Sequence, residues 1–277
     1  MRSGIDGVRR FYDLTAQEED ARLFKDRYHQ LEFIVTMHYL RKHLPGSGRI
    51  LDCGAGSGHY AIELAKMGYE VAVFDLSREL LKLARAKFER EGLAERLLAI
   101  VQGSSTNLGC FEDSYFDAAL CLGPLYHLIE ERDRDRTVRE LWRVLRPGGV
   151  LFVSAISLFG IYGTVVAEFP WELTDERHQE MLKQGIHRGE WHEDPRVFPD
   201  AYFWKPLDLK AFMEERGFET IEMAACEGVV THLRESVNSL SEEQWERLKQ
   251  IVVETSNDPT IIGHSEHFLW IGRKRPR

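Results

Sequence analysis

The sequence predicts an α/β fold, doubly wound around a mostly parallel seven-stranded sheet, with N-terminal helices and an inserted lid. The main observation is the alternation of short apolar runs with helical segments between residues 49 and 156. This alternation requires right-handed crossovers and a sheet covered on both faces. A glycine-rich turn also joins the first apolar run to a helix. With 277 residues, 43% of them hydrophobic, the chain can bury one substantial core.

The N-terminal segment is expected to form two helices. Thr15, with Glu18 three residues later, has the pattern of a capping box that starts a helix. Apolar residues then recur on one helical face from Phe33 to Leu44, and Pro45 ends the second helix. This segment is predicted to be a helical cover.

The central segment carries five of the predicted strands. They are short and apolar, and each but the last is followed by a helix or a turn signal. The expected strands cover residues 50–53, 71–75, 97–101, 116–122 and 150–155. The expected helices cover residues 60–67, a segment capped by Ser77, and the segment around Val138 to Leu145, which a Pro-Gly-Gly turn at residues 147–149 joins to the fifth strand.

After Ser157 the alternation stops for roughly fifty residues, which is too long for a simple crossover and is typical of a functional lid. Order resumes with a helix that ends at Gly217, a strand at 219–225, a helix started by a Ser241–Gln244 capping box, and a final strand at 267–272. We therefore predict four units: an N-terminal cover (1–47), a core (48–156), a lid or acceptor insertion (157–206) and the C-terminal part of the core sheet (207–277).

Composition limits the partners. There are 45 acidic and 36 basic side chains, a formal charge of −9, so most of the surface would repel a phosphate backbone and nucleic acid is a disfavoured partner. The four cysteines form no CxxC pair, which indicates neither a disulfide framework nor a zinc ribbon. No basic-then-apolar start is present, and the uncharged stretch 148–167 is interpreted as a strand and a loop rather than a membrane helix. We expect a cytoplasmic protein without a membrane partner.

The turn from Asp52 to Gly58, Asp-Cys-Gly-Ala-Gly-Ser-Gly, predicts a ligand site, because glycines let the backbone and the helix N-terminal N–H groups approach a ligand. The next strand ends at Asp75, where a carboxylate can accept hydrogen bonds from both hydroxyls of a ribose. The glycine spacing lacks the GxGxxG pattern of dinucleotide folds. Together these features indicate a nucleoside cofactor without a pyrophosphate.

At these residues the sequence resembles the class I S-adenosylmethionine-dependent methyltransferases, with a Rossmann-like fold. The other matching motifs are Gly103-Ser104-Ser105, Phe116-Asp117, Arg146-Pro147-Gly148-Gly149, and Gly123 to Leu128, a segment similar to one in small-molecule methyltransferases. The resemblance covers residues 48–156 and implies S-adenosyl-L-methionine as the cofactor. It implies cofactor contacts at Asp52, Gly54, Gly56, Gly58, Asp75, Leu76, Gly103, Ser104, Ser105 and Leu122, with Tyr12 added from the N-terminal cover.

His127 is the first candidate for a general base or acceptor-orienting group, because it follows the fourth strand at the carboxyl edge of the sheet. Tyr126 is the second candidate; a purely structural role is open for both. Arg27, Tyr28 and His29 are further candidates for contacts from the N-terminal helices. His187 and His192 lack a third ligand, so no metal site is expected.

The lid segment is rich in aromatic side chains, which favours a small acceptor with an apolar or aromatic part. No Asn/Asp-Pro-Pro-aromatic run follows the fourth strand, which argues against methylation of DNA bases. We therefore expect methyl transfer to a small molecule at an O, N, C or S atom. Three alternatives stay open: an RNA or protein methyltransferase, another transfer that uses the nucleoside, and a non-catalytic S-adenosylmethionine-binding regulator. The oligomeric state is not predicted.

Overall fold

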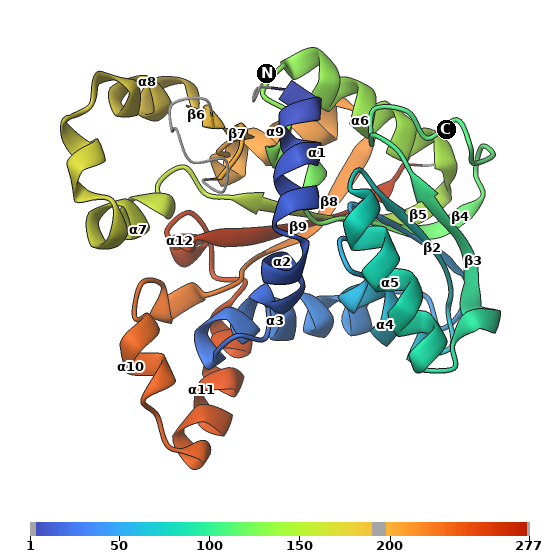
Figure 1. Ribbon diagram of the computed structural model, residues 1–277, viewed down its shortest axis with the longest axis horizontal. Helices are drawn as coiled ribbons and strands as arrows, with labels where there is room; N and C mark the ends of the chain where they lie inside the picture. Colours follow the sequence, from blue (N-terminus) through green and yellow to red (C-terminus); the bar gives the residue numbers. More distant parts are fainter. Residues whose placement is uncertain (1–3, 190–197, 276–277) are drawn as a thin grey trace.

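The computed structural model describes residues 4–189 and 198–275 (Figure 1). Its central sheet contains β1 (Arg49–Cys53), β2 (Glu70–Asp75), β3 (Leu97–Gln102), β4 (Phe116–Cys121), β5 (Leu145–Ile156), β8 (Phe218–Ala225) and β9 (His267–Lys274). The strand order is β3-β2-β1-β4-β5-β9-β8, and β9 is antiparallel to both of its neighbours. The predicted fold class is confirmed.

The sheet reverses its winding between β1 and β4, which pair in parallel although β2 and β3 lie between them in the chain. Ligands bind such folds outside the carboxyl ends of the strands at this switch point. The turn at residues 147–149, expected before the fifth strand, lies inside β5. Phe116 pairs with Leu145 and then Ala118 with Val150, so the turn forms an irregularity within the strand.

Helices cover both faces of the sheet. One face packs against α3 (Arg27–His43), α4 (His59–Lys66), α5 (Arg78–Arg90) and α11 (Glu242–Thr255). The other face packs against α6 (Glu131–Val144), α9 (Pro206–Glu215) and α12 (Pro259–Ile262). The predicted Ser77 cap and the Ser241–Gln244 capping box are both confirmed.

The N-terminal cover consists of three helices, α1 (Gly4–Leu14), α2 (Ala16–Arg22) and α3, where we expected two. The predicted capping box at Thr15 is wrong. Its backbone lies outside the extended region that an N-cap adopts, and its hydroxyl donates back to the Phe11 carbonyl at 2.9 Å. Thr15 therefore continues the last turn of α1, which turns the chain sharply into α2. Figure 1 shows α1 and α2 crossing in front of the sheet.

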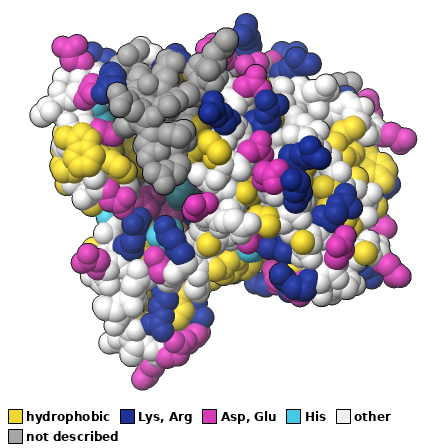
Figure 2. All heavy atoms as spheres, viewed as in Figure 1, with side chains coloured by type: hydrophobic (Ala, Val, Ile, Leu, Met, Phe, Trp, Pro, Cys, Tyr) yellow, Lys and Arg dark blue, Asp and Glu magenta, His cyan; other side chains and the backbone are white. Residues whose placement is uncertain are grey.

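The lid is partly helical, with α7 (Ile161–Glu168), η3 (Pro170–Thr174), α8 (Glu176–Gln184) and a two-stranded sheet of β6 (Ile186–His187) and β7 (Ala201–Tyr202). Buried Asp200 joins the lid to the cover, because its carboxylate accepts the N–H of Gly189 at 2.9 Å and that of Gly4 at 2.8 Å. Trp171 of η3 is 66% exposed, and hydrophobic side chains gather on this part of the surface in Figure 2. Among the described residues, no helix has the length and apolarity to cross a membrane.

Candidate active site

The glycine turn after β1 folds around the end of β2. Gly54 has a φ of +82°, and its N–H donates to the Phe74 carbonyl at 2.7 Å. A Cβ at this position would lie 2.4 Å from Cδ of Pro124, so only glycine fits between the two loops. Gly56 donates its N–H to Asp75 Oδ2 at 2.8 Å. The turn thereby holds the Asp75 side chain in place.

Asp75 is a buried carboxyl group at the carboxyl end of β2. Its Oδ1 accepts the N–H of Ser77 at 2.7 Å, so each oxygen accepts one backbone N–H and keeps a second lone-pair direction for a ligand. Burial raises the pKa of Asp75 to about 6. The Asp75 carboxylate is therefore a buried hydrogen-bond acceptor, of the kind that binds the two hydroxyls of a ribose in such folds.

A cavity opens at this switch point, and we call it the cofactor cavity. It is lined by most of the residues predicted to contact the cofactor, namely Tyr12, Gly54, Gly56, Asp75, Leu76, Gly103, Ser104, Ser105 and Leu122. Both catalytic candidates, Tyr126 and His127, line it as well. The fold thus brings the glycine turn, the Asp75 carboxylate and both catalytic candidates to one cavity.

Two predicted cofactor contacts do not line this cavity. Gly58 is the N-cap of α4 with a φ of +80°, and a Cβ there would lie 3.2 Å from Cβ of Ala84, so its smallness serves the packing of α4 on α5. Asp52 is buried in β1, and neither carboxylate oxygen has a hydrogen-bond partner within the described ranges. Burial and the nearby Asp75 raise the pKa of Asp52 to about 7.

The two serines after β3 differ in availability. The Ser105 hydroxyl is hydrogen-bonded to buried Thr137 at 3.1 Å, whereas that of Ser104 pairs with Thr106 at 2.9 Å. Ser105 is buried and Ser104 is partly exposed, so Ser104 is the better placed of the two to turn toward a ligand.

Besides Tyr12, α1 and α2 supply four residues of the cofactor cavity that were not predicted from the sequence. They are Ile5, Val8, Glu19 and Arg22. Conversely, Arg27 points away, because its guanidinium binds the Leu240 carbonyl and Glu242. An amphipathic pattern could have shown that α1 has an apolar face, but not which part of the sheet it covers.

His127 is buried and hydrogen-bonded on both sides. Its Nδ1 lies 3.0 Å from the Asp200 carbonyl oxygen, and its Nε2 lies 2.7 Å from the Tyr12 hydroxyl. A carbonyl only accepts, so Nδ1 carries the proton and Nε2 accepts from Tyr12. Burial lowers the pKa of His127 to about 4, which keeps the ring neutral. A ligand in the cavity would therefore meet the Tyr12 oxygen, because His127 Nε2 is occupied by the Tyr12 hydroxyl.

A second cavity of about 510 Å³ adjoins the first, and we call it the acceptor cavity. Tyr12, Glu19, Arg22 and Tyr126 line both cavities and form their junction. Its wall is mainly apolar, with Ile156, Ile161, Val165, Met181, Phe198 and Phe203. The predicted candidates Tyr28 and His29 also line it, and so does His187. Its size suits an acceptor with one or two rings.

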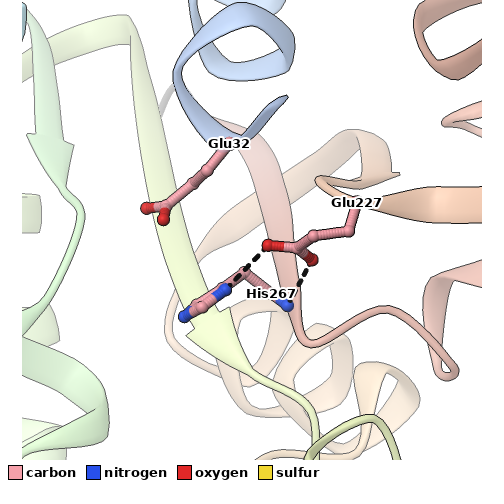
Figure 3. A group of neighbouring side chains, drawn as sticks. All are labelled: Glu32, Glu227 and His267. Carbon is pink, nitrogen blue, oxygen red and sulfur yellow. Dashed lines mark hydrogen bonds and ion pairs between the residues drawn. The ribbon is translucent and has the colours of Figure 1, made fainter. Parts of the chain in front are cut away.

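The acceptor cavity has a polar floor. Glu32 forms an ion pair with Arg22 at 2.6 Å, and Glu227 Oε1 accepts the Nδ1–H of His267 at 2.9 Å. Glu227 and Glu32 outweigh burial and raise the pKa of His267 to about 9. Figure 3 shows Glu227 and His267 joined side by side, with Glu32 approaching from α3.

Glu32, Glu227 and His267 offer ligand atoms within 4.8 Å of one another. These groups do not fit a metal at neutral pH, because His267 is held protonated while a metal ligand must be unprotonated, and Arg22 already neutralises Glu32. The histidine pair considered from the sequence forms no alternative: His187 Nε2 lies 3.2 Å from the Phe198 carbonyl oxygen, and His192 lies outside the described residues.

Comparisons with known proteins bear on the family. Residues 51–153 match the family model described as a methyltransferase domain. The chain is 34% identical to a glycine/sarcosine N-methyltransferase of Aphanothece halophytica over 116 residues, 42% of each chain. It is 31% identical to a ubiquinone biosynthesis O-methyltransferase of Xylella fastidiosa over 186 residues, 66% of each chain. The first curated relatives are matched over only 48% and 42% of their own length.

Solved structures share the fold. One similar structure is an S-adenosylmethionine-dependent methyltransferase of Methanosarcina mazei, with a TM-score of 0.59 and 22% identity, covering 86% of this chain and 98% of that one. The predicted resemblance is confirmed: the chain contains a methyltransferase domain of the class I S-adenosylmethionine-dependent type, and S-adenosyl-L-methionine is its cofactor. The residues of the cofactor cavity fit S-adenosyl-L-methionine, because a Cβ at Gly56 would meet nothing within 4 Å, which leaves the backbone open to a ligand, and Asp75 has free lone-pair directions.

Proposed function

We propose that this protein transfers a methyl group from S-adenosylmethionine to a small-molecule acceptor. The observation that carries the proposal is the pair of cavities that meet at Tyr12, Glu19, Arg22 and Tyr126. One cavity has the residues that suit the nucleoside, and the other is large enough for an acceptor. A methyl transferase needs the two ligands in contact, and this junction provides the place.

In this proposal Asp75 holds the ribose, Leu76 and Leu80 border the adenine, and the Gly54–Gly56 turn approaches the amino acid part. The bound cofactor supplies a methyl group that is already electrophilic, since it is carried by a positively charged sulfur. The acceptor atom forms the new bond with its lone pair, the sulfur keeps the electrons of the broken C–S bond, and one positive charge leaves the sulfur. The protein contributes positioning, which is worth up to about 7 to 11 kcal/mol in such reactions.

The lid and the cover favour a small acceptor over RNA or a protein. Ile161, Val165 and Met181 of the lid line the acceptor cavity from one side, and Phe11 and Tyr12 of α1 line it from another. A folded macromolecule would have to displace these elements. A binding-only regulator needs no second cavity next to the cofactor.

The test uses cofactor labelled in its methyl group. Purified protein is incubated with an extract that has been separated into metabolites, RNA and protein, and the label is followed into each fraction. We expect label in the metabolite fraction only, and none with a variant that cannot bind cofactor. Label confined to RNA or protein would refute the small-molecule acceptor. Tight cofactor binding without any transfer would favour a regulator.

A further inference from the structure

Two of the four side chains at the junction of the cavities, Tyr12 and Glu19, offer hydrogen-bond acceptors to a ligand. The proton of the Tyr12 hydroxyl is committed to His127 Nε2 at 2.7 Å, because the Asp200 carbonyl fixes the Nδ1–H tautomer. The Tyr12 oxygen can therefore only accept from a ligand. Glu19 adds a carboxylate at the same place. A ligand between them has to bring its own donors.

Tyr126 adds an independent observation. It is 8% exposed and lines both cavities. Its hydroxyl forms no hydrogen bond with any residue in the ranges 4–189 and 198–275, although its ring lies beside His127 with a centroid distance of 4.7 Å. The Tyr126 side chain is thus mostly buried while its hydroxyl opens onto the cavities, so this hydroxyl is available to hydrogen-bond a ligand at the junction.

The charges around the junction favour a cation. Arg22 directs its hydrogen bonds to Glu19 and Glu32, so it is opposed by two carboxylates. Behind them lie Glu227, paired with protonated His267, and Glu266, which accepts from Tyr28 and Thr164 and lies 3.2 Å from His232. Carboxylates thus outnumber cations in the inner part of the acceptor cavity.

The outer part of the acceptor cavity carries the remaining charges. Lys25 and Arg234 line it there, with Glu172 beside them. Arg234 is paired with Glu168 at 2.8 Å, and Lys25 is exposed. In Figure 2, acidic, basic and histidine side chains gather in a recess between the lid and the lobe formed by α10 (Arg234–Asn238) and α11. The charge of Arg234 is balanced by Glu168, and solvent screens exposed Lys25 more strongly than the buried groups at the junction.

We infer that the methyl acceptor is an amine, whose N–H groups are received by the Tyr12 oxygen, the Tyr126 hydroxyl and the Glu19 carboxylate, and whose hydrocarbon part lies on the apolar wall. This inference rests on the proposed function. An amine nitrogen takes up positive charge as it forms the N–C bond, and the carboxylates stabilise that charge. An amine that enters as an ammonium ion first gives one proton to water.

Oxygen acceptors suit this site less well. A phenol or alcohol has to lose its proton to a base to become a good nucleophile. His127, the imidazole bonded to Tyr12 at the junction, has its Nε2 occupied and a pKa of about 4, and a carboxylate acceptor would face Glu19 and Glu32. The same groups that receive an N–H donor therefore disfavour an anionic nucleophile.

The test compares head groups on one hydrocarbon part. Protein saturated with S-adenosylhomocysteine is titrated calorimetrically with benzylamine, benzyl alcohol and benzoate, and with the corresponding phenethyl and indolylethyl compounds. We expect each amine to bind at least tenfold more tightly than its alcohol, and the carboxylates to bind least. Equal binding of amine and alcohol throughout, or no amine binding below 10 mM (roughly −2.7 kcal/mol), would overturn the inference.

Two matched variants locate the effect. Glu19→Gln removes the junction carboxylate and is expected to lower amine affinity about tenfold, ~1.4 kcal/mol, while alcohol affinity stays the same. Glu18→Gln makes the same change one residue away, at an exposed position outside both cavities, and should change neither. S-adenosylhomocysteine affinity and thermal unfolding show whether each variant is folded. Equal amine affinity in both variants would refute the role of Glu19.

Transfer assays separate this inference from the proposed function. Methylation of amines, with formation of S-adenosylhomocysteine, supports both. Selective amine binding without transfer to any compound supports the amine site and contradicts the proposed enzyme activity. Methylation of phenols, carboxylates or carbon acids, with amines inert, contradicts the amine site and leaves the proposed activity intact.

Discussion

The sharpest prediction concerns Asp75→Asn and the pH dependence of cofactor binding. In the structure the two oxygens of Asp75 each accept one backbone N–H, at 2.7 and 2.8 Å, and keep one lone-pair direction for the ribose. Asparagine keeps one oxygen, loses the charge, and turns an NH₂ group toward a backbone donor. Hydrogen bonds to a charged group contribute about 1.5 to 3 kcal/mol. We expect the dissociation constant for S-adenosylmethionine to rise roughly 10- to 150-fold.

The pH profile gives the prediction a second readout. The free protein has a pKa of about 6 at Asp75 because of burial, and the ionised form is the one that accepts from two hydroxyls. Cofactor affinity should therefore be highest above pH 6 and fall as the pH drops through 6, by up to about tenfold per pH unit. Asp75→Asn should lack this component.

The assay is calorimetric titration with S-adenosylmethionine and S-adenosylhomocysteine between pH 5 and 8. Asp208→Asn is the control, because this exposed carboxylate in the first turn of α9 lies outside both cavities. Thermal unfolding checks that both variants are folded. An Asp75→Asn variant that binds within threefold of the wild type, with the same pH profile, would show that Asp75 serves only to order the loop before α5.

Three further predictions follow from single contacts. Gly54→Ala should destabilise the fold by roughly 2 to 4 kcal/mol and abolish cofactor binding, since its Cβ would lie 2.4 Å from a proline ring atom. The control is Gly56→Ala, whose Cβ would meet nothing within 4 Å and which should cost about 1 to 2 kcal/mol. Equal melting temperatures of the two variants would contradict the prediction. His267 has a pKa of about 9 in the folded protein against about 6.5 in the unfolded chain. It therefore contributes about 3 kcal/mol to the free energy of unfolding below pH 6.5, and this contribution is lost as the pH rises through 9. Denaturant unfolding should show this pH dependence in the wild type and not in His267→Gln. Tyr12→Phe removes a donor to neutral His127, so NMR titration should find the His127 pKa higher than about 4; an unchanged value would refute the tautomer assignment.

The sheet and its flanking helices could be predicted because their signals are local. Strand length, helical periodicity and the glycine turn all lie within stretches of about fifteen residues, and the Ser241–Gln244 capping box needs only four. The same holds for the link between Gly54 and Asp75, which a parallel strand pair brings together automatically. The capping box predicted at Thr15 was wrong because a threonine hydroxyl can bind either a backbone N–H of the following turn or a carbonyl of the preceding turn, and Thr15 binds the Phe11 carbonyl.

Tyr12 and Tyr126 were predicted site residues, but the contacts at the junction could not be predicted because they are long-range. The partner of His127 is 115 residues away in the chain, and the carbonyl that fixes its tautomer is 73 residues away. Glu18 and Glu19 are indistinguishable in an acidic run, yet only Glu19 turns toward the cavities. Which of two adjacent carboxylates faces a site depends on how α2 docks, and the sequence alone does not determine that rotation.

The shared junction implies that cofactor and acceptor binding are coupled. Tyr12, Glu19 and Arg22 all come from the cover and line both cavities, so a ligand in either cavity stabilises the docked position of α1 and α2. Thermodynamic linkage then requires that each ligand tighten the other by the same factor. We expect S-adenosylhomocysteine to raise amine affinity at least fivefold, and saturating amine to raise S-adenosylhomocysteine affinity equally, both by calorimetry. Asp200→Ala, which releases the N–H of Gly4, should change this factor, whereas independent binding of the two ligands would show that the cover is rigid and that the junction is only a shared wall.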